Sequence, residues 1–116
     1  MGAFDIQSVL AVVEAEQERT ARQVASLEAI VAAIVEGSAL TSTDDEHDPE
    51  GATIAYERAQ ASALLRQARA DGDALVVTRR QLEQHQQVIC SVCGRVIDLQ
   101  RVAALPTATR CVRCAT

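Results

Sequence analysis

The stretch that decides the fold is residues 6–34, IQSVLAVVEAEQERTARQVASLEAIVAAI. Apolar residues recur in it at alternating steps of four and three, and charged residues such as Glu14 and Arg22 lie between them. A seam with this spacing, kept over about four heptads, is typical of a coiled coil. We therefore predict one long helix that ends at Gly37, a natural residue for a helix C-terminus. The predicted seam positions are Ile6, Leu10, Val13, Gln17, Thr20, Val24, Leu27, Val31 and Ile34.

A second long helix is predicted after a turn over residues 37–51. Pro49 fixes its own φ and disfavours helix at the residue before it, so this helix should start at or just after Pro49. Gly72 interrupts it at a cost of about 1 kcal/mol relative to alanine. The seven-residue register survives across Gly72, which favours a continuous helix over a break into a three-helix arrangement. The register residues are Ile54, Ala61, Ala68, Leu75 and Leu82, with Leu64, Leu65 and Val76 in support.

The end of the chain carries two Cys-x2-Cys pairs: Cys90, Cys93, Cys111 and Cys114. Four thiolates complete a tetrahedral zinc shell and leave no open position, so the sequence predicts one structural zinc ion. Gly94 follows the first pair, where the turn makes a positive φ useful. Two disulfides, a redox dithiol and an iron–sulfur cluster are the alternatives, and the spacing together with a reducing compartment favours zinc. Asp98 is expected to cap a short helix through Leu105, ended by Pro106.

These elements predict an all-α fold, a long antiparallel coiled-coil hairpin capped by a small four-cysteine zinc finger. The hairpin is expected over residues 1–88, with an acidic tip at 44–51, and the finger over residues 89–116. Aromatic residues make up only 2% of the chain, which suits narrow helix seams better than a broad globular core. A hairpin with two apolar stripes closes its own seam, so we expect a monomer and leave a homodimer as the alternative.

The charge of the chain argues against nucleic acid as its default ligand. The net charge is −5, and an acidic protein gains little from counterion release on DNA. Direct sequence-specific DNA binding is therefore not expected. Four arginines in the finger either offset the charge of the zinc thiolates or are simply solvated: Arg95, Arg101, Arg110 and Arg113.

The motifs that the sequence lacks narrow the range of possible functions further. The chain lacks a run of 18 apolar residues and a basic leader at its start, so we expect a cytoplasmic protein without a membrane partner. It also lacks a glycine-rich phosphate loop and a nucleophile elbow, and we therefore expect no enzymatic activity of its own.

The finger resembles that of the DksA/TraR zinc-finger proteins of bacteria. The matching string is Cys90-x2-Cys93-Gly94, Ile97, Arg101-Val102-x-Ala104-x-Pro106-Thr107-Ala108 and Cys111-x2-Cys114. Upstream, Asp44-Asp45-x2-Asp48-Pro49 resembles the tip of the family's coiled coil. The resemblance implies that RNA polymerase is the partner. In that family the hairpin enters the secondary channel of the polymerase and its acidic tip approaches the active site, tuning initiation, often together with the alarmone ppGpp.

The candidate partner-binding residues are those of the acidic tip, Asp44, Asp45, Asp48 and Glu50. Gly51 stands where the family's best-known member carries a second aspartate. The tip could instead be a solvated loop, or it could assist transcript cleavage by the polymerase, which would need two well-placed carboxylates. Two wider alternatives stay open at this point. One is an interaction adaptor or homodimer with no polymerase role, and the other is a redox-sensing zinc protein.

Overall fold

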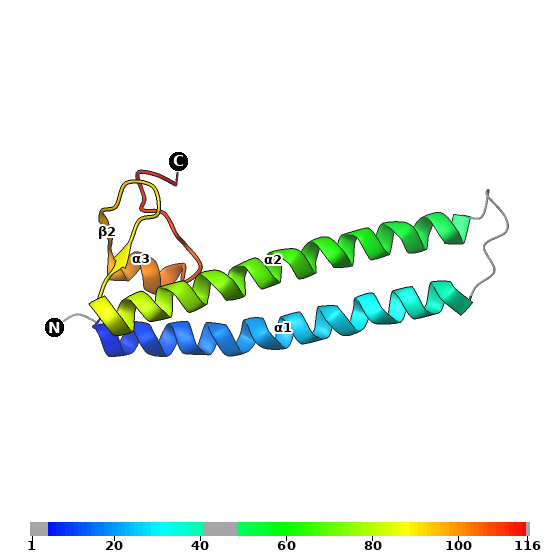
Figure 1. Cartoon of the computed structure of the whole chain (residues 1–116), viewed down its shortest axis with the longest axis horizontal. Helices are drawn as coiled ribbons and strands as arrows, with labels where there is room; N and C mark the ends of the chain where they lie inside the picture. Colours follow the sequence, from blue (N-terminus) through cyan, green and yellow to red (C-terminus); the bar gives the residue numbers. More distant parts are fainter. Residues whose placement is uncertain (1–4, 41–48, 116) are drawn as a thin grey trace. The chain divides into compact units, whose positions relative to one another are not determined.

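The structure is a computed structural model that describes residues 5–40 and 49–115, without the side chains of 38–40 and 49–50. Its elements, in chain order, are α1 (Ile6–Leu40), α2 (Pro49–His85), β1 (Val88–Ile89), β2 (Val96–Ile97) and α3 (Leu99–Ala104). Figure 1 shows them coloured along the sequence. The chain forms two compact units, one of Met1–Ala21 with Ala70–Thr116 and one of Arg22–Arg69. Both long helices contribute to both units.

The long helices start as their sequences predict, but α1 ends later. At the start of α1, the Asp5 carboxylate accepts a hydrogen bond from the Ser8 backbone N–H at 2.7 Å, and this bond lowers the pKa of Asp5. The start of α2 at Pro49 confirms the prediction. The predicted end of α1 at Gly37 is wrong, because the helix continues to Leu40. Within the described residues, Gly94 is the glycine with a positive φ, so Gly37 lacks the left-handed turn that would stop the helix.

Both predicted seams are found in the structure. Every predicted α1 position is buried or half-buried, and so are the five α2 positions spaced seven apart. The supporting roles given to Leu64 and Val76 are wrong, since these side chains are 51% and 44% exposed. Each lies next to a buried neighbour, and adjacent residues of a helix point about 100° apart. The helix is also continuous through Gly72, as the register predicts.

The two long helices pair antiparallel in each unit. In the first unit, Arg79 of α2 reaches Glu14 of α1 at 3.1 Å and donates to the Gln17 side chain at 3.0 Å. In the second unit, Arg69 of α2 lies 3.7 Å from Glu28 of α1. Because lower-numbered residues of α2 meet higher-numbered residues of α1, the two helices run in opposite directions. The prediction of an all-α antiparallel hairpin with a four-cysteine segment is confirmed.

The zinc-finger segment packs against the first unit's helices through one shared core. That core is formed by α1, α2 and the finger, through Val9, Val13, Leu75, Leu82, Val88, Cys90, Ile97 and Val102. In Figure 1 the finger accordingly lies beside the start of α1 and the end of α2. The predicted domain boundary between residues 88 and 89 stays a prediction. In the described part of the chain, neither long helix has an apolar window sufficient to cross a membrane.

The end of α2 gives a testable prediction on backbone conformation. Gln86 has a φ of +58°, a left-handed conformation that is unfavourable for a residue with a Cβ, and its N–H closes the last turn onto the Leu82 carbonyl at 3.0 Å. We expect Gln86→Gly to leave the free energy of unfolding unchanged or raise it by up to about 1 kcal/mol, because relief of strain offsets the extra freedom of the unfolded chain.

Urea unfolding of the zinc-loaded protein measures this effect. The matched control is Gln87→Gly, at an exposed neighbour without a positive φ. That control should lower the free energy of unfolding by about 0.4–1 kcal/mol. Equal losses in the two variants would contradict the strain at residue 86.

Candidate metal centre

The four cysteine side chains meet in one cluster. Their Sγ atoms all lie within 4.8 Å of one another, and the Cys93 and Cys111 sulfurs are 3.8 Å apart. All four are free thiols, so the two-disulfide alternative is not what the structure shows. In a tetrahedral site with Zn–S bonds of about 2.3 Å, the sulfurs are about 3.8 Å apart. The cluster therefore has the dimensions of a four-thiolate zinc site.

The first Cys pair is placed by the β-hairpin that the sequence did not predict. β1 and β2 pair antiparallel, with Val88 opposite Ile97 and Ile89 opposite Val96. Cys90 follows β1 directly, and its backbone N–H donates to the Arg95 carbonyl at 2.8 Å. The turn between them uses Gly94 at a φ of +73°, as its position after Cys93 predicts. The short strands thus hold together the two ends of the turn from Cys90 to Arg95, which we call the first knuckle; the second knuckle is the turn from Cys111 to Cys114.

The second pair follows α3 and is tied back to the first pair. Asp98 is the N-cap of α3, and its carboxylate accepts from the Gln100 N–H at 3.2 Å, which confirms the predicted cap. From the end of α3 the chain returns so that the Ser91 N–H donates to the Thr109 carbonyl at 2.8 Å. The Cys111 N–H then donates to the Cys90 sulfur at 3.3 Å. These contacts bring together thiols that lie far apart in sequence.

The electrostatics of the thiols suit a bound cation. Backbone N–H groups, first that of Cys93 and then that of Cys111, lower the pKa of the Cys90 thiol to about 6. The Cys114 pKa is raised to about 12, first by its hydrogen bond with the Cys111 thiol and then by burial. Four clustered sulfurs cannot all ionise without a compensating charge, and a divalent ion supplies it.

The arginines of the finger are distributed unequally around this centre. Arg95, Arg101 and Arg113 line a groove that also includes Cys111, while Arg110 is exposed and does not line it. The Arg101 Nε–H donates to the Arg110 carbonyl at 3.0 Å. These residues are predicted from the sequence to be counter-charges or solvated groups, but the sequence does not predict that three of them share one groove.

The acidic tip predicted from the sequence falls outside most of what the structure describes. Asp44, Asp45 and Asp48 lie outside the described residues. Glu50 belongs to the first turn of α2, and its side chain is among those not described. The role assigned to these carboxylates therefore stays a prediction.

The geometry defines a small four-thiol zinc finger packed on a helical hairpin. Comparison with known proteins gives its family: residues 87–116 match the model of the prokaryotic dksA/traR C4-type zinc finger. This match of the C-terminal segment confirms the resemblance that the sequence predicts. The C4 type of the family and the clustered thiols together identify one zinc ion as the metal.

Among curated proteins, none matches. Among solved structures, transcription factor DksA2 from Pseudomonas aeruginosa is similar at 21% identity, with a TM-score of 0.48. The alignment covers 90% of this chain and 81% of that one.

Proposed function

We propose that the protein is a zinc-binding prokaryotic transcription regulator that binds RNA polymerase. The observation that carries this proposal is the match of residues 87–116 to the dksA/traR finger. The antiparallel pairing of α1 and α2 supports it, because a helical hairpin is the element that the family resemblance assigns to the polymerase's secondary channel. In this proposal the protein acts in the cytoplasm, by binding rather than by catalysis.

The zinc ion has a structural role in this proposal, with Cys90, Cys93, Cys111 and Cys114 as its four ligands. A complete thiolate shell offers no coordination position for water or substrate. Cys90 also lies in the core shared by the finger and the two helices. The metal therefore acts by holding the finger against the helix ends, and the contact with the polymerase's active-site region is assigned to other residues.

That contact is assigned to the carboxylates of the tip, Asp44, Asp45, Asp48 and Glu50. Carboxylates bind Mg²⁺ directly or through water, and they pair with basic side chains. Acids presented at the turn of a hairpin could thus contact either the walls of a basic channel or the metal of an active site. Asp48 is the residue on which the resemblance to the family's tip depends most, since it directly precedes Pro49.

A binding and transcription experiment tests the polymerase proposal. The tagged full chain, loaded with zinc, should retain purified RNA polymerase and change the yield of a promoter-dependent transcript. We expect Asp48→Ala to reduce the transcriptional effect about tenfold or more, because it removes a charge-assisted contact of the carboxylate on which the resemblance to the family's tip depends most. Binding itself should weaken less, since the rest of the hairpin is unchanged.

The matched control is Asp73→Ala, which removes the same charge from an exposed position of α2. This variant should act like the wild type. Failure of the wild-type chain to bind polymerase would overturn the proposal. A fully active Asp48→Ala would overturn the role assigned to the tip but not the proposal that the chain binds polymerase.

We propose a monomer as the working form. The seam residues of α1 and α2 are covered by each other within each unit, for example Leu27 by Leu65 and Ala68. A second chain is therefore not needed to bury either stripe. Sedimentation equilibrium tests this point, and a stable dimer that depends on the seam residues would favour the adaptor alternative instead.

A further inference from the structure

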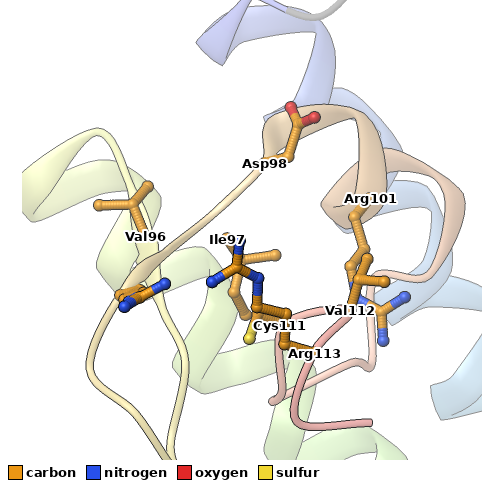
Figure 2. A pocket seen from close by; sticks show the side chains of 8 residues that line it. Val96, Ile97, Asp98, Arg101, Cys111, Val112 and Arg113 are labelled. Atoms are coloured by element: carbon orange, nitrogen blue, oxygen red, sulfur yellow. The ribbon is translucent and has the colours of Figure 1, made fainter. Parts of the chain in front are cut away.

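A groove on the zinc finger has no role in the function proposed above. Its volume is about 220 Å³, and it lies between β2, the start of α3 and the second Cys pair. The apolar part of its wall comes from Val96, Ile97 and Val112. Figure 2 shows Ile97 in the middle, with Val96 to one side and Arg101 and Val112 to the other. The space matches one aliphatic side chain of a ligand better than an extended cofactor.

Two of the three apolar residues of the wall are exposed. Val96 is 55% exposed and Val112 is 64% exposed, while Ile97 beneath them is buried to 1%. Val112 lies between Cys111 and Cys114, whose sulfurs belong to the thiol cluster, so its position in the chain is tied to that cluster. Fixed, exposed aliphatic groups around a hollow are a feature of interaction sites on small domains.

The charge around the groove is positive, in contrast to the rest of the chain. Residues 89–116 contain four arginines and one aspartate, whereas the whole chain carries a net charge of −5. Three of the arginines, Arg95, Arg101 and Arg113, line the groove. The aspartate, Asp98, lines it too and leaves an excess of positive charge among the ionised side chains of the wall. The hydrogen bond from Arg101 to the Arg110 carbonyl fixes the position of one guanidinium. Guanidinium groups at fixed positions pair well with carboxylates, which they can contact through two N–H groups.

Two other roles for these arginines predict different ligands. Charge compensation of the zinc thiolates would need the arginines alone and would give the exposed valines no part. Nucleic-acid binding would use the same charge, but the strongly acidic remainder of the chain opposes it, and aliphatic walls offer no stacking surface to a base. A peptide with one aliphatic side chain and flanking carboxylates uses both the charge and the apolar wall.

We propose that this groove binds an acidic segment of a partner protein. An aliphatic side chain of that segment lies over Ile97 between the two valines, and carboxylates on either side of it pair with the arginines. The inference goes beyond the polymerase proposal and does not depend on it, because the groove is formed by the finger alone and its test uses no polymerase.

Selection from a displayed library of random heptapeptides on the immobilised, zinc-loaded full chain tests this proposal. We expect peptides with an aliphatic residue flanked by acids to be enriched about tenfold or more over the input, since several weak pairs and one apolar contact act together. The double variant Arg95→Gln/Arg113→Gln should lose this enrichment. Val112→Ser should reduce it severalfold without any change of charge.

Matched controls lie in the same finger. Arg110→Gln removes one exposed arginine that does not line the groove. Val92→Ser removes an aliphatic side chain, 62% exposed, between the two cysteines of the first pair. Both should keep the enrichment. Zinc content is measured for every variant, so that loss of the metal is distinguished from loss of the groove.

Three results would overturn the proposal. The first is an absence of acidic peptides among those selected on the wild-type chain. The second is full enrichment on Val112→Ser, which would show that the apolar wall takes no part in binding. The third is binding of a fluorescent single-stranded thymidine oligonucleotide by the wild type with no peptide selected, which would assign the groove to nucleic acid.

Discussion

Replacement of Cys111 by serine is expected to remove zinc from the protein and to unfold the finger together with the ends of both long helices. The Cys111 sulfur lies 3.8 Å from that of Cys93, in the cluster that identifies the site. Serine is nearly isosteric but a poor zinc ligand at neutral pH, because its hydroxyl stays protonated. Without four thiolates the site no longer holds the ion firmly, and metal content should fall from one zinc per chain to near zero.

The second part of this prediction concerns the helices. The finger residues Val88, Ile97 and Val102 share a core with side chains of α1 and α2. When the finger unfolds, those helix ends lose their cover, so helical signal should begin to decrease at a lower temperature. Zinc content and thermal unfolding by circular dichroism measure the two effects, and excess chelator added to the wild type should reproduce them.

The matched control for Cys111→Ser is Ser91→Ala. Ser91 is exposed in the first knuckle, and its link to the Thr109 carbonyl comes from its backbone. This variant should keep one zinc and the wild-type unfolding temperature. If Cys111→Ser also kept its zinc, Cys111 would not be a ligand. If it lost zinc but kept the wild-type unfolding curve, the finger and the helices would not be coupled as the shared core indicates.

The second large effect is expected from Leu82→Ala in α2. Leu82 is fully buried in the core that joins the helices to the finger. Truncation of a buried leucine removes apolar contacts and leaves a cavity, which costs about 2–5 kcal/mol of the free energy of unfolding. For a chain of this size, such a loss lowers the unfolding temperature by roughly 10 °C or more.

Leu64→Ala provides the comparison on the same helix. Leu64 is 51% exposed, so the same truncation should change the free energy of unfolding by less than about 0.5 kcal/mol. Urea unfolding of the zinc-loaded variants measures both values. Similar losses at the two positions would show that the burial assigned to α2 is incorrect.

The sequence predicted the features that depend on regular spacing. The α1 seam, the start of α2 at Pro49 and the clustering of the four cysteines each follow from a repeat or a motif that acts locally. It was less informative where a choice depends on three-dimensional contacts. Leu64 and Val76 are as apolar as the core leucines, and only the packing of α2 on α1 decides that they stay exposed.

The finger shows the same limit in its strands and its groove. A pair of two-residue strands is too short to give an alternating pattern, so the β-hairpin of Val88–Ile89 with Val96–Ile97 had no sequence signal. The groove formed by three arginines and two exposed valines was also missed, because these residues are brought together by the return of the chain after α3. Spacing identified the metal site, and tertiary contacts formed the surface beside it.

The core shared by the helices and the finger also bears on how the chain folds as it is made. Val9 and Val13 leave the ribosome well before Ile97 and Val102, the residues of the finger that share their core. Residues 22–69 can pair their own helices sooner, because their contacts lie closer together in sequence. The apolar start of α1 therefore lacks its packing partners until the finger has been synthesised and folded. Zinc binding then becomes a late step of folding. In a metal-starved cell, we expect newly made chains to collect with this end still unpaired and open to proteases.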